Sequence, residues 1–348
     1  MSVGFVLRRF SEDRIGIFSV FYIVAMVFIA IFAYWIAPDS SPNANQMHLS
    51  IHSKPPGFST QILILPNPNA DQGTEEIAID RLFWKQDQLF YNASGTPKDY
   101  LQPIDLSRYP SKTSYLEVEK SYVKEREFLL GTDKYGRDLL SRVLIGSRIS
   151  LSIGFIAVLI SLVVGVFIGA IAGFFGGSVD RFMVWLINVV WSIPTLLMVI
   201  GITLALGKGY WQVFIAVGLT MWVEVARVVR GQVISIKEKT YVQAARVLGY
   251  TNYRILLKHI LPVVIPPLIV ISAANFASAI LIESGLSFLG IGAQPPVPSW
   301  GGMIKDHFRY ILLGKPYLAV VPGLAIMSLV FAFMTLGNSL RDALDVKT

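Results

Sequence analysis

The sequence of 348 residues contains no cysteine, few charged residues and no nucleotide-binding loop. Without cysteine, the chain has no disulfides, thiolate metal sites or cysteine nucleophiles. Without a G-x-x-x-x-G-K-[S/T] motif, it lacks the loop that cradles nucleotide phosphates. The four histidines are scattered, and His48 and His52 have no third ligand nearby, so we expect neither a metal site nor a catalytic centre.

Charged residues make up only 15% of the chain, whereas 53% of its residues are hydrophobic and gather in long blocks. A block of about 18 or more apolar residues indicates a transmembrane helix. The expected fold is therefore an all-α polytopic membrane protein. Its six transmembrane helices are expected at residues 15–36, 149–173, 182–206, 211–229, 260–282 and 316–336.

The net charge of +7 is explained by Lys and Arg beside membrane spans. No zinc-finger spacing or basic heptad region indicates a nucleic-acid partner, and the expected contact surface is the lipid bilayer. Arg8, Arg9 and Arg14 place the N-terminus in the cytoplasm. Six spans then return the C-terminus to that side, and they also place the basic loop 230–262 there.

A long polar segment separates the first two expected spans. Residues 61–65 and 82–91 resemble strands, and residues 115–128 alternate charged and apolar side chains. We expect a small extracytoplasmic insertion of mixed or β structure. The predicted domains are the N-terminus with the first helix (1–37), the insertion (38–128), and a core transmembrane domain (129–348) that contains the loop 230–262.

The most informative segment of that loop is residues 241–249, which predicts a short helix stopped by Gly249, before a second helix and Pro262. Ala244 and Ala245 are small, so the helix could approach another surface closely. The residues alone leave a solvated amphipathic linker equally open.

This segment resembles the "EAA" loop of ATP-binding-cassette (ABC) importer permeases. It departs from that pattern at Gln243, where the family has Glu, and at His259, where it has Ile. In that family the loop forms a coupling helix that docks in a cleft of the ATPase subunit. The residues that this resemblance assigns to ATPase coupling are Gln243, Ala244, Ala245, Leu248, Gly249, Leu261 and Pro262.

Residues 131–138 resemble the G-T-D-x-x-G-R-D motif of the dipeptide/oligopeptide/nickel permease family, in its second, "C"-type subunit. The segments 192–197, 283–301 and 337–345 resemble three further motifs of the same family, in order. The motif residues at the outer segment are Gly131, Thr132, Asp133, Gly136, Arg137 and Asp138. The resemblance covers residues 1–37 and 129–348, and the insertion is longer than the family leads us to expect.

The resemblance implies a permease for di- or oligopeptides in a bacterial inner membrane. Its partners would be a second permease in a heterodimer, two ABC ATPases and an extracytoplasmic solute-binding protein. The ATPases would use ATP and Mg, and this chain would bind no cofactor and catalyse no reaction. The alternatives are an ion-gradient-driven secondary transporter, which the scarcity of charge in the spans disfavours, and a membrane-bound enzyme or sensor.

Several individual residues allow two interpretations. Asp133, Arg137 and Asp138 fit ion pairs better than contacts with cargo or binding protein. Glu283, at the outer end of a span, fits a structural role better than a functional one. Two further expectations are an ion pair between Glu224 and Arg227, and close helix packing at Gly165, Gly169 and Gly173. Pro194 is a candidate hinge or pathway residue, or a packing feature.

Overall fold

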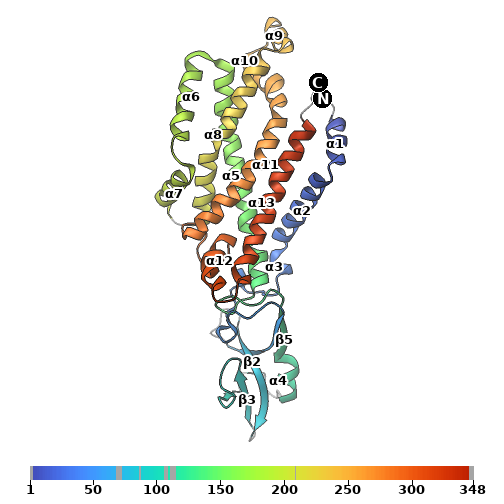
Figure 1. Ribbon diagram of the computed structural model, residues 1–348, viewed down its shortest axis with the longest axis vertical. Helices are drawn as coiled ribbons and strands as arrows, with labels where there is room; N and C mark the ends of the chain where they lie inside the picture. Colours follow the sequence, from blue (N-terminus) through green and yellow to red (C-terminus); the bar gives the residue numbers. More distant parts are fainter. Residues whose placement is uncertain are drawn as a thin grey trace. The chain divides into compact units, whose positions relative to one another are not determined.

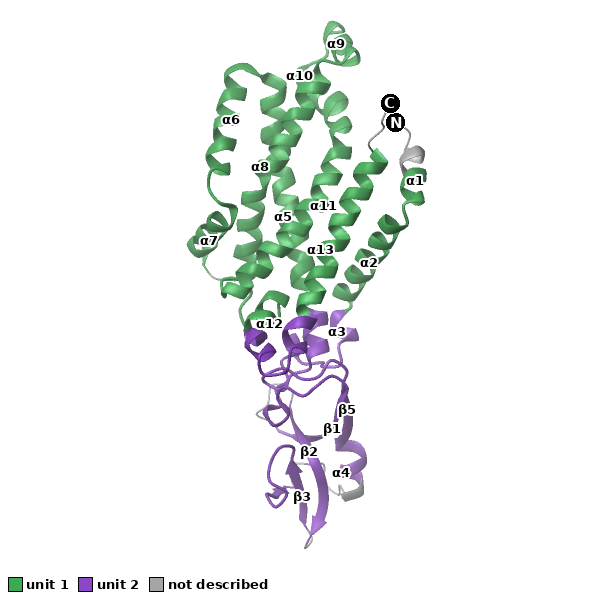
Figure 2. Ribbon diagram, in the orientation of Figure 1, with its two compact units in different colours: residues 1–32, 146–305, 322–348 green, residues 33–145, 306–321 purple. Residues whose placement is uncertain are grey.

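The computed structural model describes residues 3–67, 73–85, 88–105, 109, 115–207 and 209–344. The chain forms two compact units, shown in Figure 2. Unit 1 comprises Met1–Phe32, Gly146–Lys305 and Pro322–Thr348, and unit 2 comprises Ala33–Ile145 and Asp306–Val321. Unit 2 is thus larger than the predicted insertion 38–128, because it also takes in the segments around it and one from near the C-terminus.

Unit 1 is a helical bundle (Figure 1). Of its elements, α5, α12 and α13 also contribute residues to unit 2. The helices are α1 (Val3–Glu12), α2 (Arg14–Ile31), α5 (Leu139–Phe175), α6 (Gly177–Trp191), α7 (Thr195–Leu206), α8 (Tyr210–Lys237), α9 (Thr240–Val247), α10 (Asn252–Ile255), a π-helical turn (Leu256–Ile260), α11 (Leu261–Leu289), α12 (Trp300–His307) and α13 (Tyr317–Leu344).

Five helical segments are long and apolar enough to cross a membrane: α2, α5, α8, the run Asn252–Leu289 and α13. The pair α6–α7 makes a sixth if it counts as one span, although its two halves meet at 86°. The expected polytopic fold is therefore confirmed. The fourth span is longer than expected, because α8 continues to Lys237 rather than ending near residue 229.

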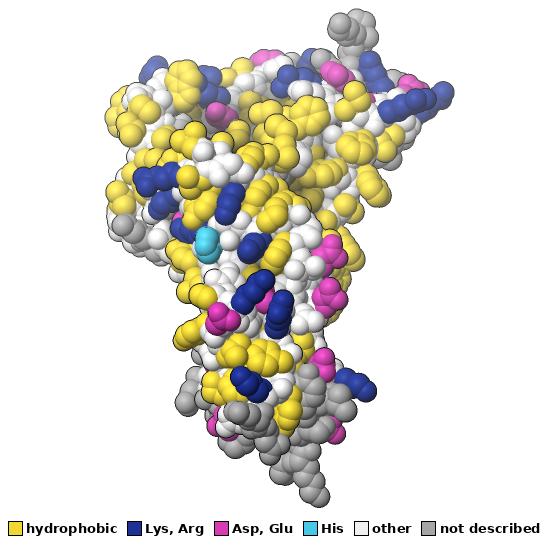
Figure 3. All heavy atoms as spheres, turned by 60° about the horizontal axis from the view of Figure 1, so that its bottom comes forward, with side chains coloured by type: hydrophobic (Ala, Val, Ile, Leu, Met, Phe, Trp, Pro, Cys, Tyr) yellow, Lys and Arg dark blue, Asp and Glu magenta, His cyan; other side chains and the backbone are white. Residues whose placement is uncertain are grey.

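Apolar side chains face outward over much of unit 1. Hydrophobic side chains cover a large part of its visible surface in Figure 3. On α2, Phe18 and Phe21 are 67% and 70% exposed. Such a surface is stable only against lipid or another subunit.

The helix at the centre of the packing is α8. In its most apolar stretch of 18 residues, 67% is buried within the protein, whereas the corresponding share in α2 is 17%. Three glycines of α5 lie against it, as the sequence predicts. A Cβ on Gly165 would lie 2.5 Å from Val225 Cβ, one on Gly173 would lie 2.9 Å from the Arg230 carbonyl, and one on Gly169 would collide with the Ala226 carbonyl. The two helices can approach this closely only because side chains are absent there.

Unit 2 is built on an antiparallel sheet with strand order β4-β3-β2-β1-β5. Its core contains Leu63, Ile79, Leu89 and, from a helix on the sheet, Val118. This confirms the mixed character expected of the insertion. The expected strand 82–91 falls on parts of two strands. The elements are β1 (Phe58–Pro66), β2 (Thr74–Lys85), β3 (Gln88–Ala93), β4 (Gln102–Ile104), α4 (Tyr115–Tyr122) and β5 (Val123–Phe128), with short 3-10 turns at Pro42–Ala44, Leu49–Ile51 and Phe308–Ile311.

Two backbone segments of unit 2 touch where Gly131 and Gly136 adopt positive φ angles of 79° and 75°. A Cβ on Gly131 would overlap the Lys54 carbonyl, and one on Gly136 would overlap the His48 carbonyl. Glycine is therefore required at both positions for two reasons, namely its backbone conformation and the space available.

The substitution Gly169→Ala is expected to destabilise unit 1 by ~1–3 kcal/mol, because the added methyl group overpacks the α5–α8 contact. The measurement is thermal unfolding of the purified protein in detergent. Gly323→Ala is the matched control, since this glycine lies within α13 with no atom within 4 Å of the added Cβ. Equal melting temperatures for the two variants would contradict the proposed close contact.

The substitution Gly136→Ala is expected to loosen the contact between residues 48–54 and 131–139, because the methyl group meets the His48 carbonyl. Gly57→Ala has nearly the same φ, 76°, with nothing within 4 Å, so it isolates the backbone penalty of about 1–2 kcal/mol. Hydrogen exchange on the full-length protein should show faster exchange at both segments in Gly136→Ala. The account is wrong if Gly57→Ala accelerates exchange there equally.

Candidate functional site

The segment predicted to couple to an ATPase folds as two short helices. The first helix, α9, ends at Val247 and is followed by Gly249. The φ of 78° at Gly249 allows the left-handed turn that terminates the helix. Gly249 N–H donates to the Arg246 carbonyl at 2.9 Å, and Tyr250 N–H donates to the Ala245 carbonyl at 3.1 Å. The Thr251 hydroxyl caps α10 by accepting from Arg254 N–H. The helix, glycine stop and second helix are as the sequence predicts.

One face of α9 packs on the bundle. Val242 and Ala245 are buried in a cluster that includes Ile236 of α8 and Ile255 of α10. The Gln243 amide donates to the Lys237 carbonyl at 3.3 Å. Among the predicted coupling residues, Ala245 and Gln243 therefore hold α9 against the ends of its neighbours. Leu261 is partly buried beside the same cluster, and Pro262 opens α11.

The opposite face of α9 is exposed. Ala244 and Gly249 lie on it, and Leu248 is 72% exposed. Val247, 88% exposed, extends this apolar face, although sequence reasoning did not select it. The available signal was its position beside Leu248 at the end of a helix that already buries its other apolar residues. In Figure 1, α9 lies at the end of unit 1 where α1 begins and α13 finishes.

The motif residues 131–138 belong to unit 2 and bind one another. Asp133 is fully buried: its Oδ1 accepts from the Arg137 N–H at 3.0 Å, and its Oδ2 accepts from Arg137 Nε at 2.6 Å. Arg137 also donates to Asn45 Oδ1 at 2.9 Å, and Thr132 donates to the Ile51 carbonyl. The expected ion pair is present, within a turn rather than a helix.

The neighbouring carboxyl, Asp138, caps the start of α5. It accepts from the Ser141 N–H at 2.9 Å and contacts the Ser141 hydroxyl. Burial raises the pKa of this carboxyl above its ordinary value, against the effect of these hydrogen bonds. The motif therefore holds a buried polar network, and these contacts support the structural interpretation of its charged residues.

Pro194 lies at the 86° break between α6 and α7 and forms the N-cap of α7. This is the bend expected of a proline in a span. Glu283 is buried in α11, where its Oε1 accepts from the Ser287 hydroxyl at 2.7 Å. The Ser287 oxygen in turn accepts from Ala293 N–H at 3.2 Å, so Glu283 orders the turn that follows α11.

The expected ion pair between Glu224 and Arg227 is absent from the part of the chain that the structure describes. Arg227 donates instead to Asn188 Oδ1 at 3.1 Å and lies over the Trp191 ring at 3.7 Å. Glu224 lies near the middle of α8, not near its end, because that helix continues to Lys237. Its exposed side chain lines a cavity beside the α6–α7 break.

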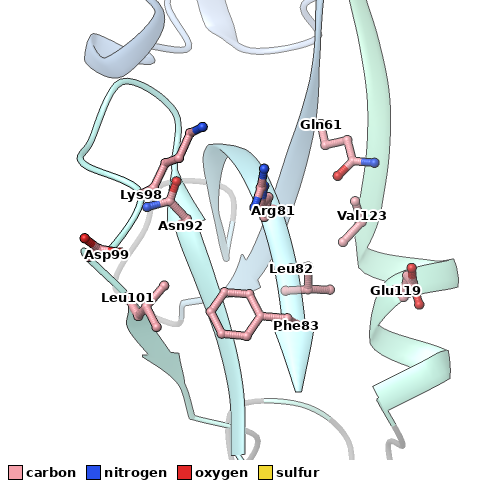
Figure 4. A pocket seen from close by; sticks show the side chains of 10 residues that line it. All are labelled: Gln61, Arg81, Leu82, Phe83, Asn92, Lys98, Asp99, Leu101, Glu119 and Val123. Atoms are coloured by element: carbon pink, nitrogen blue, oxygen red, sulfur yellow. The ribbon is translucent and has the colours of Figure 1, made fainter. Parts of the chain in front are cut away.

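Unit 2 carries a separate pocket of about 740 Å³ on its sheet. Figure 4 shows its side chains, which include Arg81 and Lys98 as well as Asp99 and Glu119. Because its lining carries both positive and negative side chains, the pocket could bind a polar group that also carries both signs of charge.

Two family models match the chain. Residues 165–348 match the binding-protein-dependent transport system inner membrane component, and residues 5–56 match the N-terminal transmembrane domain of oligopeptide transport permease C. The second match and the relative from Lactococcus lactis described next both extend into the insertion. That relative matches 97% of this chain, whereas the other two relatives described below match 71% and 69% of it.

Three curated relatives illustrate the similarity. The glutathione transport system permease protein of Pectobacterium atrosepticum is 37% identical over 71% of this chain and 80% of its own length. The oligopeptide transport system permease protein of Bacillus subtilis is 40% identical over 69% and 78%. The dipeptide transport system permease protein of Lactococcus lactis subsp. cremoris is 31% identical over 97% and 88%.

Among solved structures, an inward-facing form of the MetNI methionine ABC transporter has a chain that matches 59% of this one and 97% of its own length. The identity is 16% and the TM-score 0.50, so this likeness concerns the fold alone. The chain belongs to the family of binding-protein-dependent transport system inner membrane components, multi-pass permeases of ABC importers, and within it to the type represented by oligopeptide transport permease C.

Proposed function

We propose that this chain is one of two permeases of a peptide importer, and that α9 is the element on which an ATPase partner acts. The relatives carry the names of dipeptide, oligopeptide and glutathione systems, whose cargoes share a peptide backbone. This common chemistry makes peptides the proposed cargo class. The family match lends no support to the alternative of an ion-gradient-driven secondary transporter.

The observation that carries the proposal is the division of α9 into two faces. Its buried face, Val242 and Ala245, fixes it to the ends of α8 and α10. Its outer face presents Val247 and Leu248, which bury little within this chain. Adjacent exposed aliphatic side chains at a helix end provide an apolar anchor for a partner's pocket.

If an ATPase moves α9, side-chain packing can transmit that movement to other helices. A displacement of α9 presses on Ile236 and Ile255, which share one apolar cluster with Val264 of α11. Since closely packed cores deform little, α8 and α11 should move with α9. Both helices line the cavity that contains Glu224, so the push would reach the interior of the bundle.

The orientation follows from the positive-inside rule. Arg8 and Arg9 of α1, Arg14 of α2 and the basic residues around α9 favour a cytoplasmic location for this end of unit 1, where ATP is available. Two ABC ATPases would bind ATP and Mg, and this chain would bind no cofactor and catalyse no hydrolysis. A solute-binding protein would deliver peptide from the other side, and a second permease would complete the pathway as a heterodimer.

The double substitution Val247→Glu/Leu248→Glu is expected to abolish co-purification of the ATPases and to lower ATP-driven peptide uptake at least tenfold. Docking of the ATPase would bury the two introduced carboxylates in an apolar interface, and the cost of removing their charges from water is too high. The measurement is pull-down of the ATPases with the tagged chain, followed by uptake into proteoliposomes.

Leu49→Glu provides the control, because Leu49 is also an exposed leucine, 66% exposed, but lies in unit 2. This variant should retain its ATPases. Normal ATPase recovery and uptake in the double variant would show that α9 is not the docking element.

A further inference from the structure

The cavity beside the α6–α7 break is a partly open hollow in unit 1, and its composition is unusual for a transmembrane bundle. It measures about 360 Å³, within the roughly 300–1,000 Å³ of ligand pockets. Its wall combines the end of α6 (Trp191), the start of α7 (Thr195), the middle of α8 (Glu224) and α11 (Ser278). Apolar side chains supply most of the remaining wall, and Glu224 is the one ionisable group among the described residues that line it.

Glu224 forms no ion pair with any residue that the structure describes. The nearest expected cation, Arg227, is held by Asn188 and by the Trp191 ring. In the described part of the chain, no residue forms a hydrogen bond or ion pair with the side chain of Glu224, Thr195 or Ser278. A carboxylate at mid-helix in a membrane bundle is costly unless a cation or water meets it, and such residues commonly mark a transport route.

The helix break strengthens the preference for positive charge. At Trp191, α6 ends beside the cavity, and the carbonyl end of a helix carries partial negative charge. In discontinuous helices, this end favours cations. The field of the α6 end and the charge of Glu224 therefore act in the same direction.

Every unmodified peptide carries one ammonium group at its N-terminus. We propose that Glu224 receives the cargo's N-terminal ammonium in this cavity during translocation, with Ser278 and Thr195 available as hydrogen-bond partners. The proposal rests on the peptide cargo proposed above. It assigns this chain a cargo contact of its own, separate from selection by the solute-binding protein.

The absence of cysteine from the sequence allows a direct test of the cavity's charge. Ser278→Cys introduces a single thiol of nearly the same size into the wall of the cavity that Glu224 also lines. In the assembled complex, a cationic methanethiosulfonate reagent should label this thiol at least fivefold faster than an anionic one, as read from the mass of this chain. Adding Glu224→Gln should reduce that ratio to within twofold, while Glu238→Gln, an exposed carboxylate at the end of α8, should leave it unchanged.

Uptake by the complete importer tests the role in transport. Glu224→Gln should lower the uptake of trialanine at least tenfold with the ATPases still bound, and Glu224→Asp should retain more uptake than Glu224→Gln. Trialanine should slow labelling of Ser278→Cys by the cationic reagent, and N-acetyl-trialanine should not.

Equal labelling ratios with and without Glu224, or unchanged uptake in Glu224→Gln, would overturn the cargo contact. These outcomes are distinct from a failure of the coupling role of α9, because that failure appears as retained ATPases in the Val247→Glu/Leu248→Glu variant. The labelling ratio requires neither ATP nor uptake.

Discussion

Close packing around α8 is the constraint on which the rest of the helical unit depends. The glycines of α5 let the two backbones approach until only hydrogen atoms fit between them at Gly169. The other side of α8 contacts α7 and α11, and its last turns contact α9. Because these contacts are closely packed, they deform little. A displacement at the α9 end should therefore be transmitted along α8 to the cavity.

This arrangement connects two otherwise separate features. The exposed pair Val247 and Leu248 lies at one end of α8, and Glu224 lies near its middle. At about 1.5 Å per residue, the distance from Glu224 to the last turn is roughly 20 Å. A single rigid helix therefore spans the gap between the proposed site of the push and the proposed site of the cargo, and no chain of mobile side chains is needed.

Much of this could be predicted from the sequence, and the error that bears on the cavity has a physical cause. The apolar blocks predicted the spans, Gly249 predicted the end of α9, and the small residues of α5 predicted its close packing. The error concerned where α8 ends. Residues 230–237 include Arg230 and Lys237, which favour water, yet they continue the helix beyond the apolar block. Hydropathy marks where a helix leaves the membrane, not where its hydrogen bonds stop.

That boundary error also concealed the significance of one of two carboxylates. Glu283 was expected to have a structural role, and its burial and its hydrogen bond from Ser287 support that role. Glu224 looked like half of a routine ion pair at a helix end. Its i,i+3 neighbour Arg227 instead stacks on the Trp191 ring and donates to Asn188, and both of these residues belong to α6. Local spacing along α8 contains no information about that competition, because the competing groups lie more than 30 residues away.

The break between α6 and α7 and the unpaired Glu224 side chain both require polar groups or water around them. A bend of 86° interrupts the helical hydrogen bonds of a span, and unpaired backbone groups in hydrocarbon cost several kcal/mol each. An unpaired carboxylate in hydrocarbon costs at least about 2.5 kcal/mol. Lipid satisfies neither group, whereas water or a polar cargo satisfies both. Since the two features face one cavity, a single hydrated pathway shared with a second permease relieves both costs, and this side of the bundle is where we place it.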